Sequence, residues 1–282
     1  MGELAERTGT VEGAGGLSLF YRRLAIEPER ARLIIAHGLG EHSGRYGHVF
    51  SALAPRGFSI WALDHRGHGR SEGRRGHVDK FDHYLADLGL MVRLALEDRP
   101  EGRKVFLLGH SLGGLMSLSF ALGFPELLDG VIASSPALGM VIQVPAAKKF
   151  LGRVMSGLWP GLAMGNELDP QKLSHDPEVV RAYVEDPLVH DRVTARFFTE
   201  FMAAMEATNQ SAPQMSVPTL LQVAGDDHLV SAQASRDFFE RLGGPDKTLH
   251  VYDGLYHEIY NEVPEKRAGA LGDLCAWLEA RI

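Results

Sequence analysis

The chain has 282 residues, 45% of them hydrophobic, and a formal net charge of −7. This length fits one large α/β domain with an insertion better than two equal domains. The net negative charge argues against a nucleic-acid partner. The basic residues are also scattered along the chain rather than gathered in one segment. One cysteine, Cys275, rules out a disulfide framework and favours the cytoplasm. No signal peptide or membrane-spanning stretch is recognisable, so we expect a soluble protein.

Apolar, β-rich runs alternate with helical patterns along the chain. Residues 17–26 are typical of an antiparallel edge strand at the start. The later runs are apolar almost throughout, as in strands of a parallel sheet buried on both faces. They lie at 31–38, 58–64, 104–109, 130–136, 218–225 and 247–254. Helical patterns lie at 82–98, 115–124, 231–242 and 266–282. This alternation predicts right-handed βαβ units in a mostly parallel sheet flanked by helices.

One stretch breaks the alternation. Between residues 138 and 214 no strand is predicted, and the pattern is helical with proline breaks. We expect a helical cap here, over the carboxyl ends of the strands. The cap would divide the core into a first part, 1–137, and a second part, 215–282. Methionines gather in this stretch, and flexible thioethers suit varied apolar ligands, although ordinary core packing explains them equally well.

The pattern Gly-x-Ser-x-Gly occurs twice, around Ser71 and around Ser111. Ser71 lies among charged and glycine-broken residues, so we interpret it as a loop residue. Ser111 follows a predicted strand and precedes a predicted helix, which is the context of a nucleophile elbow. Glycines on both sides of Ser111 remove Cβ atoms that would collide in such a tight turn. Ser111 is therefore the predicted nucleophile.

A serine nucleophile needs a base, and in this kind of sheet the order along the chain is Ser, Asp, His. His257 follows the last predicted strand and is the predicted base; His110, inside the elbow, fits less well. The preceding predicted strand, 218–225, is followed directly by Asp226 and Asp227. We prefer Asp227 as the acid, because the hydrophobic residues after it would tuck the loop back onto the protein. Asp253 is a third candidate.

Acyl transfer also needs two N–H donors for the oxyanion of the tetrahedral intermediate. One is expected from Leu112, directly after the nucleophile. The other is expected from the glycine-rich loop that follows the predicted strand 31–38, where Leu39 is best placed.

These motifs together resemble the monoacylglycerol lipase branch of the α/β-hydrolases. The segments that carry the resemblance are HGLGEHSGRY (37–46), LDHRGHGRSEG (63–73), GHSLGG (109–114), LSHDPEVVRAYVEDPLVH (173–190) and YDGLYHEIYNEVPE (252–265). The acid loop has one residue fewer than is usual in that family between its glycine and the acid. Alignment from the C-terminal side still places Asp227 on the acid.

The resemblance implies an eight-stranded α/β-hydrolase fold with a helical cap. It implies hydrolysis of monoacylglycerols to fatty acid and glycerol by Ser111, Asp227 and His257, without metal or cofactor. The cap would form an apolar tunnel for the acyl chain. Tyr183 resembles the family's cap tyrosine at a polar end for glycerol, and Glu41 and Arg45 lie on a loop that could face the same end. A solvent-exposed or loop-bracing role is the alternative for these three residues. Transient contact of the cap with a membrane surface is a further expectation.

Three other functions stay open from the sequence. A carboxylesterase or a lysophospholipase would use the same catalytic residues on another lipid or small ester. A non-catalytic ligand-binding member of the fold is a remote alternative, because every catalytic role has an occupant.

Overall fold

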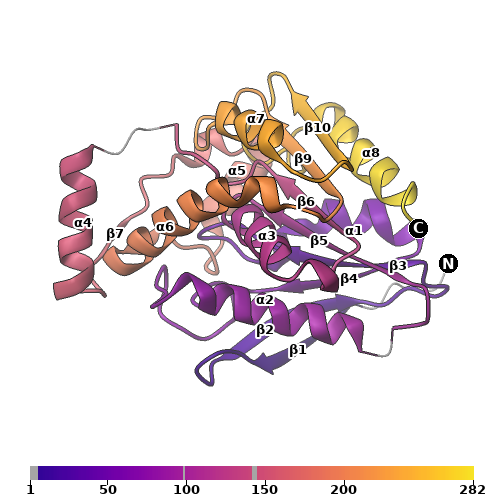
Figure 1. Cartoon of the computed structure of the whole chain (residues 1–282), viewed down its shortest axis with the longest axis horizontal. Helices are drawn as coiled ribbons and strands as arrows, with labels where there is room; N and C mark the ends of the chain where they lie inside the picture. The colour runs from indigo at the N-terminus through magenta and orange to yellow at the C-terminus, as the bar shows by residue number, and fades with distance from the viewer. Residues whose placement is uncertain (1–5, 98, 142–144) are drawn as a thin grey trace.

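The computed structural model describes residues 6–97, 99–141 and 145–282 (Figure 1). The strands in these ranges are β1 (Glu6–Glu12), β2 (Ser18–Leu24), β3 (Ala31–Ala36), β4 (Phe58–Leu63), β5 (Lys104–His110), β6 (Gly130–Ser134), β7 (Ala163–Gly165), β8 (Arg192–Thr194), β9 (Thr219–Ala224) and β10 (Lys247–Tyr252). The α-helices are α1 (Gly47–Leu53), α2 (Phe81–Leu96), α3 (Leu112–Gly123), α4 (Ala146–Leu158), α5 (Pro177–Glu185), α6 (Ala195–Ser211), α7 (Ala232–Arg241) and α8 (Pro264–Glu279).

Eight of the strands form one sheet in the order β1-β2-β4-β3-β5-β6-β9-β10. The pairs β1/β2 and β2/β4 are antiparallel, and all the later pairs are parallel. The central parallel strands are buried along their whole length, as their apolar sequences predict. The expected α/β-hydrolase sheet is therefore confirmed.

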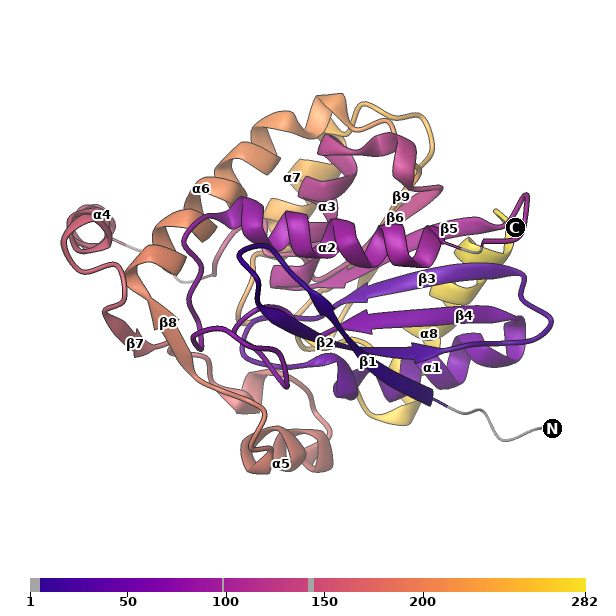
Figure 2. The same ribbon diagram turned by 90° about the horizontal axis from the view of Figure 1, so that it is seen from below.

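Helices cover both faces of the sheet. Side chains alternate along β3, so that Ile34 and Ala36 join the core under α2 and α3, whereas Leu33 and Ile35 join the core under α1 and α8. Figure 2 shows α2 and α3 on one side of the strands and α1 on the other. Two apolar cores thus fix the sheet, and with it the strand ends that carry the site.

The structure differs from the sequence expectations at the start of the chain. The edge strand is β1, which the sequence did not predict, and β2 lies inside it. β1 reads ERTGTVE and is mostly exposed, since it pairs on one side only and buries little apolar surface. The short helix α1 was also not predicted.

The segment between β6 and β9, here called the inserted segment, holds α4, α5, α6 and the short antiparallel pair β7/β8. The pair β7/β8 was not predicted, because three-residue strands leave no readable alternation. In Figure 1 α4 stands away from the sheet, and α6 connects this end of the molecule to α3. None of the helices in the described ranges has both the length and the apolar character that a membrane crossing requires.

Candidate active site

Ser111 lies at a strained turn between β5 and α3. Its backbone adopts φ 53° and ψ −115°, a left-handed conformation that residues other than glycine rarely adopt. The elbow also needs close backbone approach: a Cβ on Gly109 would lie 2.0 Å from the carbonyl oxygen of Gly113, and a Cβ on Gly113 would lie 2.1 Å from that of Ala36. The backbone strain therefore lies at Ser111, and the flanking glycines leave the space that this strained conformation needs.

His257 and Asp227 meet across the carboxyl ends of β10 and β9. His257 Nδ1 lies 2.7 Å from Asp227 Oδ2, and both side chains are almost completely buried. The other carboxylate oxygen, Oδ1, accepts hydrogen bonds from the amides of Leu229 at 2.8 Å and Val230 at 3.0 Å. These contacts fix the carboxylate, which in turn orients the imidazole so that Nε2 is left for chemistry.

The pKa values of this pair shift in opposite directions. Burial alone would lower the pKa of His257, but the charge and hydrogen bond of Asp227 outweigh burial, and the pKa is raised above its usual 6.5. Burial alone would raise the pKa of Asp227, but His257 and the two backbone amides outweigh burial and lower it. Asp227 therefore stays ionised and favours the cationic imidazole that a general base becomes.

The two other candidate acids lie elsewhere. The side chain of Asp226 is 56% exposed and faces His228 at 3.7 Å rather than His257. Asp253 is exposed at the end of β10. Only Asp227, of these three, contacts the ring of His257.

Ser111 and His257 line one cavity together with the two predicted oxyanion donors, Leu39 and Leu112. Leu112 is the first residue of α3, so its amide N–H lies at the positive end of the helix. Within the described ranges, neither the Leu39 amide nor the Leu112 amide donates a hydrogen bond to another residue. Both N–H groups are thus available to an oxyanion beside Ser111.

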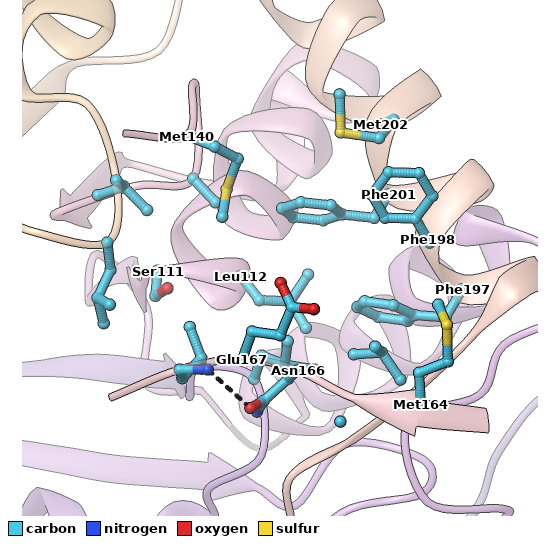
Figure 3. Close-up of a pocket in the computed structure, with 18 of the residues that line it drawn as sticks. Ser111, Leu112, Met140, Met164, Asn166, Glu167, Phe197, Phe198, Phe201 and Met202 are labelled. Atoms are coloured by element: carbon cyan, nitrogen blue, oxygen red, sulfur yellow. Dashed lines mark hydrogen bonds between the residues drawn. The ribbon is translucent and has the colours of Figure 1, made fainter. Parts of the chain in front are cut away.

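The cavity has a volume of about 360 Å³, and most of its wall is apolar. Its side chains come from the elbow, from the loop after β3 and mainly from the inserted segment (Figure 3). Figure 3 shows Phe197, Phe198 and Phe201 of α6 facing Ser111 and Leu112 across this space, with Met140 beside them. An aliphatic chain would bury its surface here, which is the main driving force for binding such a ligand.

Several polar side chains also line the cavity, and three of them meet around Arg45. Glu41, Tyr183 and Glu258 line it, and Arg45 contacts all three, with its Cζ 4.8 Å from the centre of the Tyr183 ring. Arg45 is held by the carboxylates of Glu41 and Glu258, so its guanidinium points to these carboxylates rather than into the cavity.

Residues 27–264 match the protein family described as serine aminopeptidase, S33. The chain belongs to this family. A curated relative of this S33-family chain is the monoacylglycerol lipase of Mycolicibacterium smegmatis, 33% identical over 272 residues and 96% of each chain. An uncharacterized abhydrolase domain-containing protein of Dictyostelium discoideum is 36% identical over 254 residues; that match covers 89% of this chain and 26% of the longer protein.

The fold of this S33-family chain also matches the folds of solved structures. The crystal structure of the Paleococcus ferrophilus monoacylglycerol lipase matches it with a TM-score of 0.86 and 37% sequence identity, covering 94% of this chain and 99% of that one. The resemblance to monoacylglycerol lipases that the motifs indicated is therefore confirmed.

Sequence reasoning missed two neighbours of the base in this S33-family site. The ring of His110 lies 4.6 Å from the ring of His257, and burial, followed by His257, lowers its pKa to about 4. Glu258 was read only as part of a family motif, but its side chain pairs with Arg45, 213 residues away in the sequence. The sequence shows only that an acidic residue directly follows the candidate base, and the burial that makes this neighbour significant is visible in the structure alone.

Proposed function

We propose that this protein is a serine hydrolase that cleaves the ester bond of monoacylglycerols to a fatty acid and glycerol. The observation that carries the proposal is the place of Ser111, at the wall of a mostly apolar cavity that is also lined by His257, the partner of Asp227. The similarity over nearly the whole chain to monoacylglycerol lipases supports this choice of ester.

In the proposed reaction, Ser111 Oγ attacks the ester carbonyl while His257 Nε2 accepts its proton. Asp227 holds the imidazole through Nδ1–H and stabilises its cationic form. The N–H groups of Leu39 and Leu112 stabilise the oxyanion. Collapse of the intermediate releases glycerol, which takes the proton from His257, and leaves an acyl-enzyme. His257 then activates a water that hydrolyses the acyl-enzyme, so the cycle uses no metal or cofactor.

We assign the acyl chain to the apolar part of the cavity and the glycerol to the part lined by Glu41 and Tyr183. The phenylalanines of α6 and the methionines near them would pack against the chain. Glu41 and Tyr183 would face the glycerol hydroxyls. Arg45 would act behind them, by holding Glu41 and packing on the Tyr183 ring.

We propose that residues 138–214 form the cap and that α4 rests transiently on a membrane surface. Leu151 and Met155 of α4 line the cavity, while Phe150 and Leu158 on the same helix are 69% and 80% exposed. An exposed apolar patch at the mouth of a lipid-binding cavity suits a substrate drawn from a bilayer. The cytoplasm stays the proposed location, which the single cysteine favours.

The deciding experiment is a substrate panel for the wild type and Ser111→Ala. The panel holds monoacylglycerols from C8 to C18, p-nitrophenyl esters, a lysophospholipid and an aminoacyl p-nitroanilide. We expect long-chain monoacylglycerols to be hydrolysed best and Ser111→Ala to abolish turnover. Preference for another member of the panel would contradict the assignment of monoacylglycerol as the substrate. Failure of a fluorophosphonate probe to label the folded protein would contradict the proposed serine-hydrolase activity itself.

Membrane contact has a separate test. Flotation with neutral and anionic liposomes at low salt should carry the protein upward, and Phe150→Ser with Leu158→Ser should abolish flotation. Absence of wild-type binding to both liposomes would remove this part of the proposal.

A further inference from the structure

A buried ion pair joins the loop of the candidate base to the loop after β3. Glu258 directly follows His257, and its side chain is 4% exposed. Arg45 Nη1 and Nη2 donate to its two carboxylate oxygens at 2.6 and 2.7 Å, and Asn261 Nδ2 donates at 2.9 Å. A bidentate pair between arginine and carboxylate fixes both distance and angle, because two parallel hydrogen bonds share one plane.

The chain of hydrogen bonds continues to the predicted oxyanion donor. Arg45 Nη1 also donates to Glu41 Oε2 at 2.7 Å. The other oxygen of Glu41 accepts from the amide of Gly38 at 2.6 Å and from the hydroxyl of Tyr46 at 2.8 Å. Gly38 is the residue before Leu39. The base and the oxyanion donor are thus linked through three buried side chains.

The charges of this network do not cancel. Glu41 and Glu258 each carry a negative formal charge and Arg45 a positive one, which leaves one net negative charge beside His257 and His110. Burying charges costs free energy that well-packed apolar residues would not cost, so stability alone does not explain the arrangement. A negative charge near an imidazole stabilises its cationic form.

We propose that Glu258 is a positioning residue of the reaction, which holds the His257 loop to the oxyanion loop through Arg45 and Glu41 and favours the imidazolium form of His257. This inference rests on the proposed serine-hydrolase function. Glu258 lines the cavity, but its two carboxylate oxygens accept from Arg45 and Asn261, so we assign its effect to the position and charge state of the base.

Several titratable groups face His257, from four parts of the chain. They are Asp227 after β9, His110 in the elbow, Glu41 in the loop after β3, and Glu258 on its own loop; His228 lines the same cavity. Burial lowers the pKa of His257, and Asp227 first, then Glu258 and Glu41, raise it. With its pKa near 4, His110 is neutral where the base works, so Asp227 and Glu258 contribute most to the charge around it.

The test separates the charge of Glu258 from the geometry of its pair with Arg45. Glu258→Gln removes the charge and keeps most of the shape. We expect kcat on a p-nitrophenyl ester to fall about 10-fold with KM nearly unchanged, because the NH2 of glutamine cannot accept from Arg45, and the weakened pair lets the base shift. We also expect the acidic limb of the kcat/KM profile to move down by about one pH unit, since the imidazolium loses a negative neighbour.

Arg45→Lys provides the opposite case. It keeps the positive charge but lacks the planar guanidinium, so kcat should fall by a similar factor while the acidic limb stays in place. In the double variant the two losses in kcat should be less than additive, as for groups that act through one contact. An unshifted limb in Glu258→Gln, or full additivity, would overturn the inference.

A matched control breaks an equally buried pair whose residues do not line the cavity. Arg66 Nε lies 2.6 Å from Asp87 Oδ2, with side-chain exposures of 7% and 1%. Asp87→Asn should lower the melting temperature and leave the acidic limb unchanged. If it shifts the limb as much as Glu258→Gln does, the shift is a general effect of lost stability and the inference is wrong.

The activity of the wild type distinguishes failure of this inference from failure of the proposed function. A wild type that hydrolyses the ester and reacts with a fluorophosphonate, beside variants with unchanged profiles, contradicts only the role of Glu258. A wild type that does neither contradicts both.

Discussion

The two Gly-x-Ser-x-Gly sites of this chain use the same residues in opposite ways. In the loop after β4, the glycines adopt the left-handed conformation, with φ 51° at Gly69 and 107° at Gly73, and the serine between them does not. In the elbow, the serine is left-handed, with φ 53°, and its flanking glycines allow close contact of backbones instead. The motif therefore marks two unrelated turns, and the elements on either side decide which one forms.

The two serine hydroxyls differ accordingly. Ser71 Oγ donates to the carbonyl oxygen of Asp64 and accepts from the amide of Phe20, so it ties its loop to β2. Ser111 Oγ has no hydrogen-bond partner among the described residues, although it shares a cavity with His257. A hydroxyl that both donates and accepts a hydrogen bond has a structural role. A hydroxyl without such partners, in a cavity that an imidazole also lines, is available as a nucleophile.

The largest expected difference between the two sites is in turnover. Ser111→Ala should reduce kcat on the preferred ester by at least about 10³-fold, because no other group can form the acyl-enzyme. Ser71→Ala should stay within about 3-fold of the wild type, since its hydroxyl does not reach the cavity. Initial-rate kinetics on both variants at matched folded fractions measure this. A large loss in Ser71→Ala would break the comparison.

The next effect concerns Asp227, the proposed acid partner of His257. Asp227→Asn should lower kcat by about 10²–10⁴-fold, because the amide favours the wrong tautomer of His257 and no longer stabilises its cation. Asp226→Asn is the matched control: it is the adjacent aspartate, exposed and facing His228, and should change kcat less than about 2-fold. Equal losses in the two variants would show that the loop, not the hydrogen bond to His257, is what matters.

A smaller effect tests the space inside the elbow. Gly113→Ala would place a Cβ 2.1 Å from the carbonyl oxygen of Ala36, a backbone atom that cannot turn away. We expect a loss of about 3 kcal/mol in the free energy of unfolding, measured by urea denaturation. Gly123→Ala, at the other end of α3, meets open space and should be neutral or stabilising by about 0.5 kcal/mol. Similar values for both would contradict the steric account of the elbow.

Much of this arrangement could be predicted from the sequence because it depends on local pattern. Strands buried on both faces are apolar throughout, so the parallel sheet was readable, and residues after the strands gather at one edge of a parallel sheet. Ser111 and His257 are predicted as nucleophile and base on that basis, and the structure places both at one cavity. The choice of Asp227 over Asp226 depends on the hydrophobic residues that follow it, since two adjacent side chains in a loop point in different directions and the pattern of strands alone does not say which one faces the base.

The rest depends on contacts that leave no local pattern. The strand β1 lies at the edge of the sheet, where a mostly exposed strand can be polar and shows no apolar run. The strands β7 and β8 are too short to show alternation. The pair of Arg45 with Glu258 joins residues 213 positions apart, and neither residue is unusual in its own segment. Long-range ion pairs are set by the way the loops converge, so they become visible only when the strands are in place.

The smallest effect compares two buried serines, one from each site region. Ser71→Ala leaves the amide of Phe20 and the carbonyl of Asp64 without the partner they share, and should lower the free energy of unfolding by about 1–3 kcal/mol. Ser117 in α3 is equally buried, but its Oγ has no hydrogen-bond partner within the described ranges. Ser117→Ala should therefore change stability by less than about 0.5 kcal/mol or raise it, since only an unsatisfied hydroxyl is lost. Urea denaturation of both variants measures the difference. If Ser117→Ala were as destabilising as Ser71→Ala, burial alone would explain the loss, and Ser71 would no longer stand apart as the serine whose hydrogen bonds hold its loop.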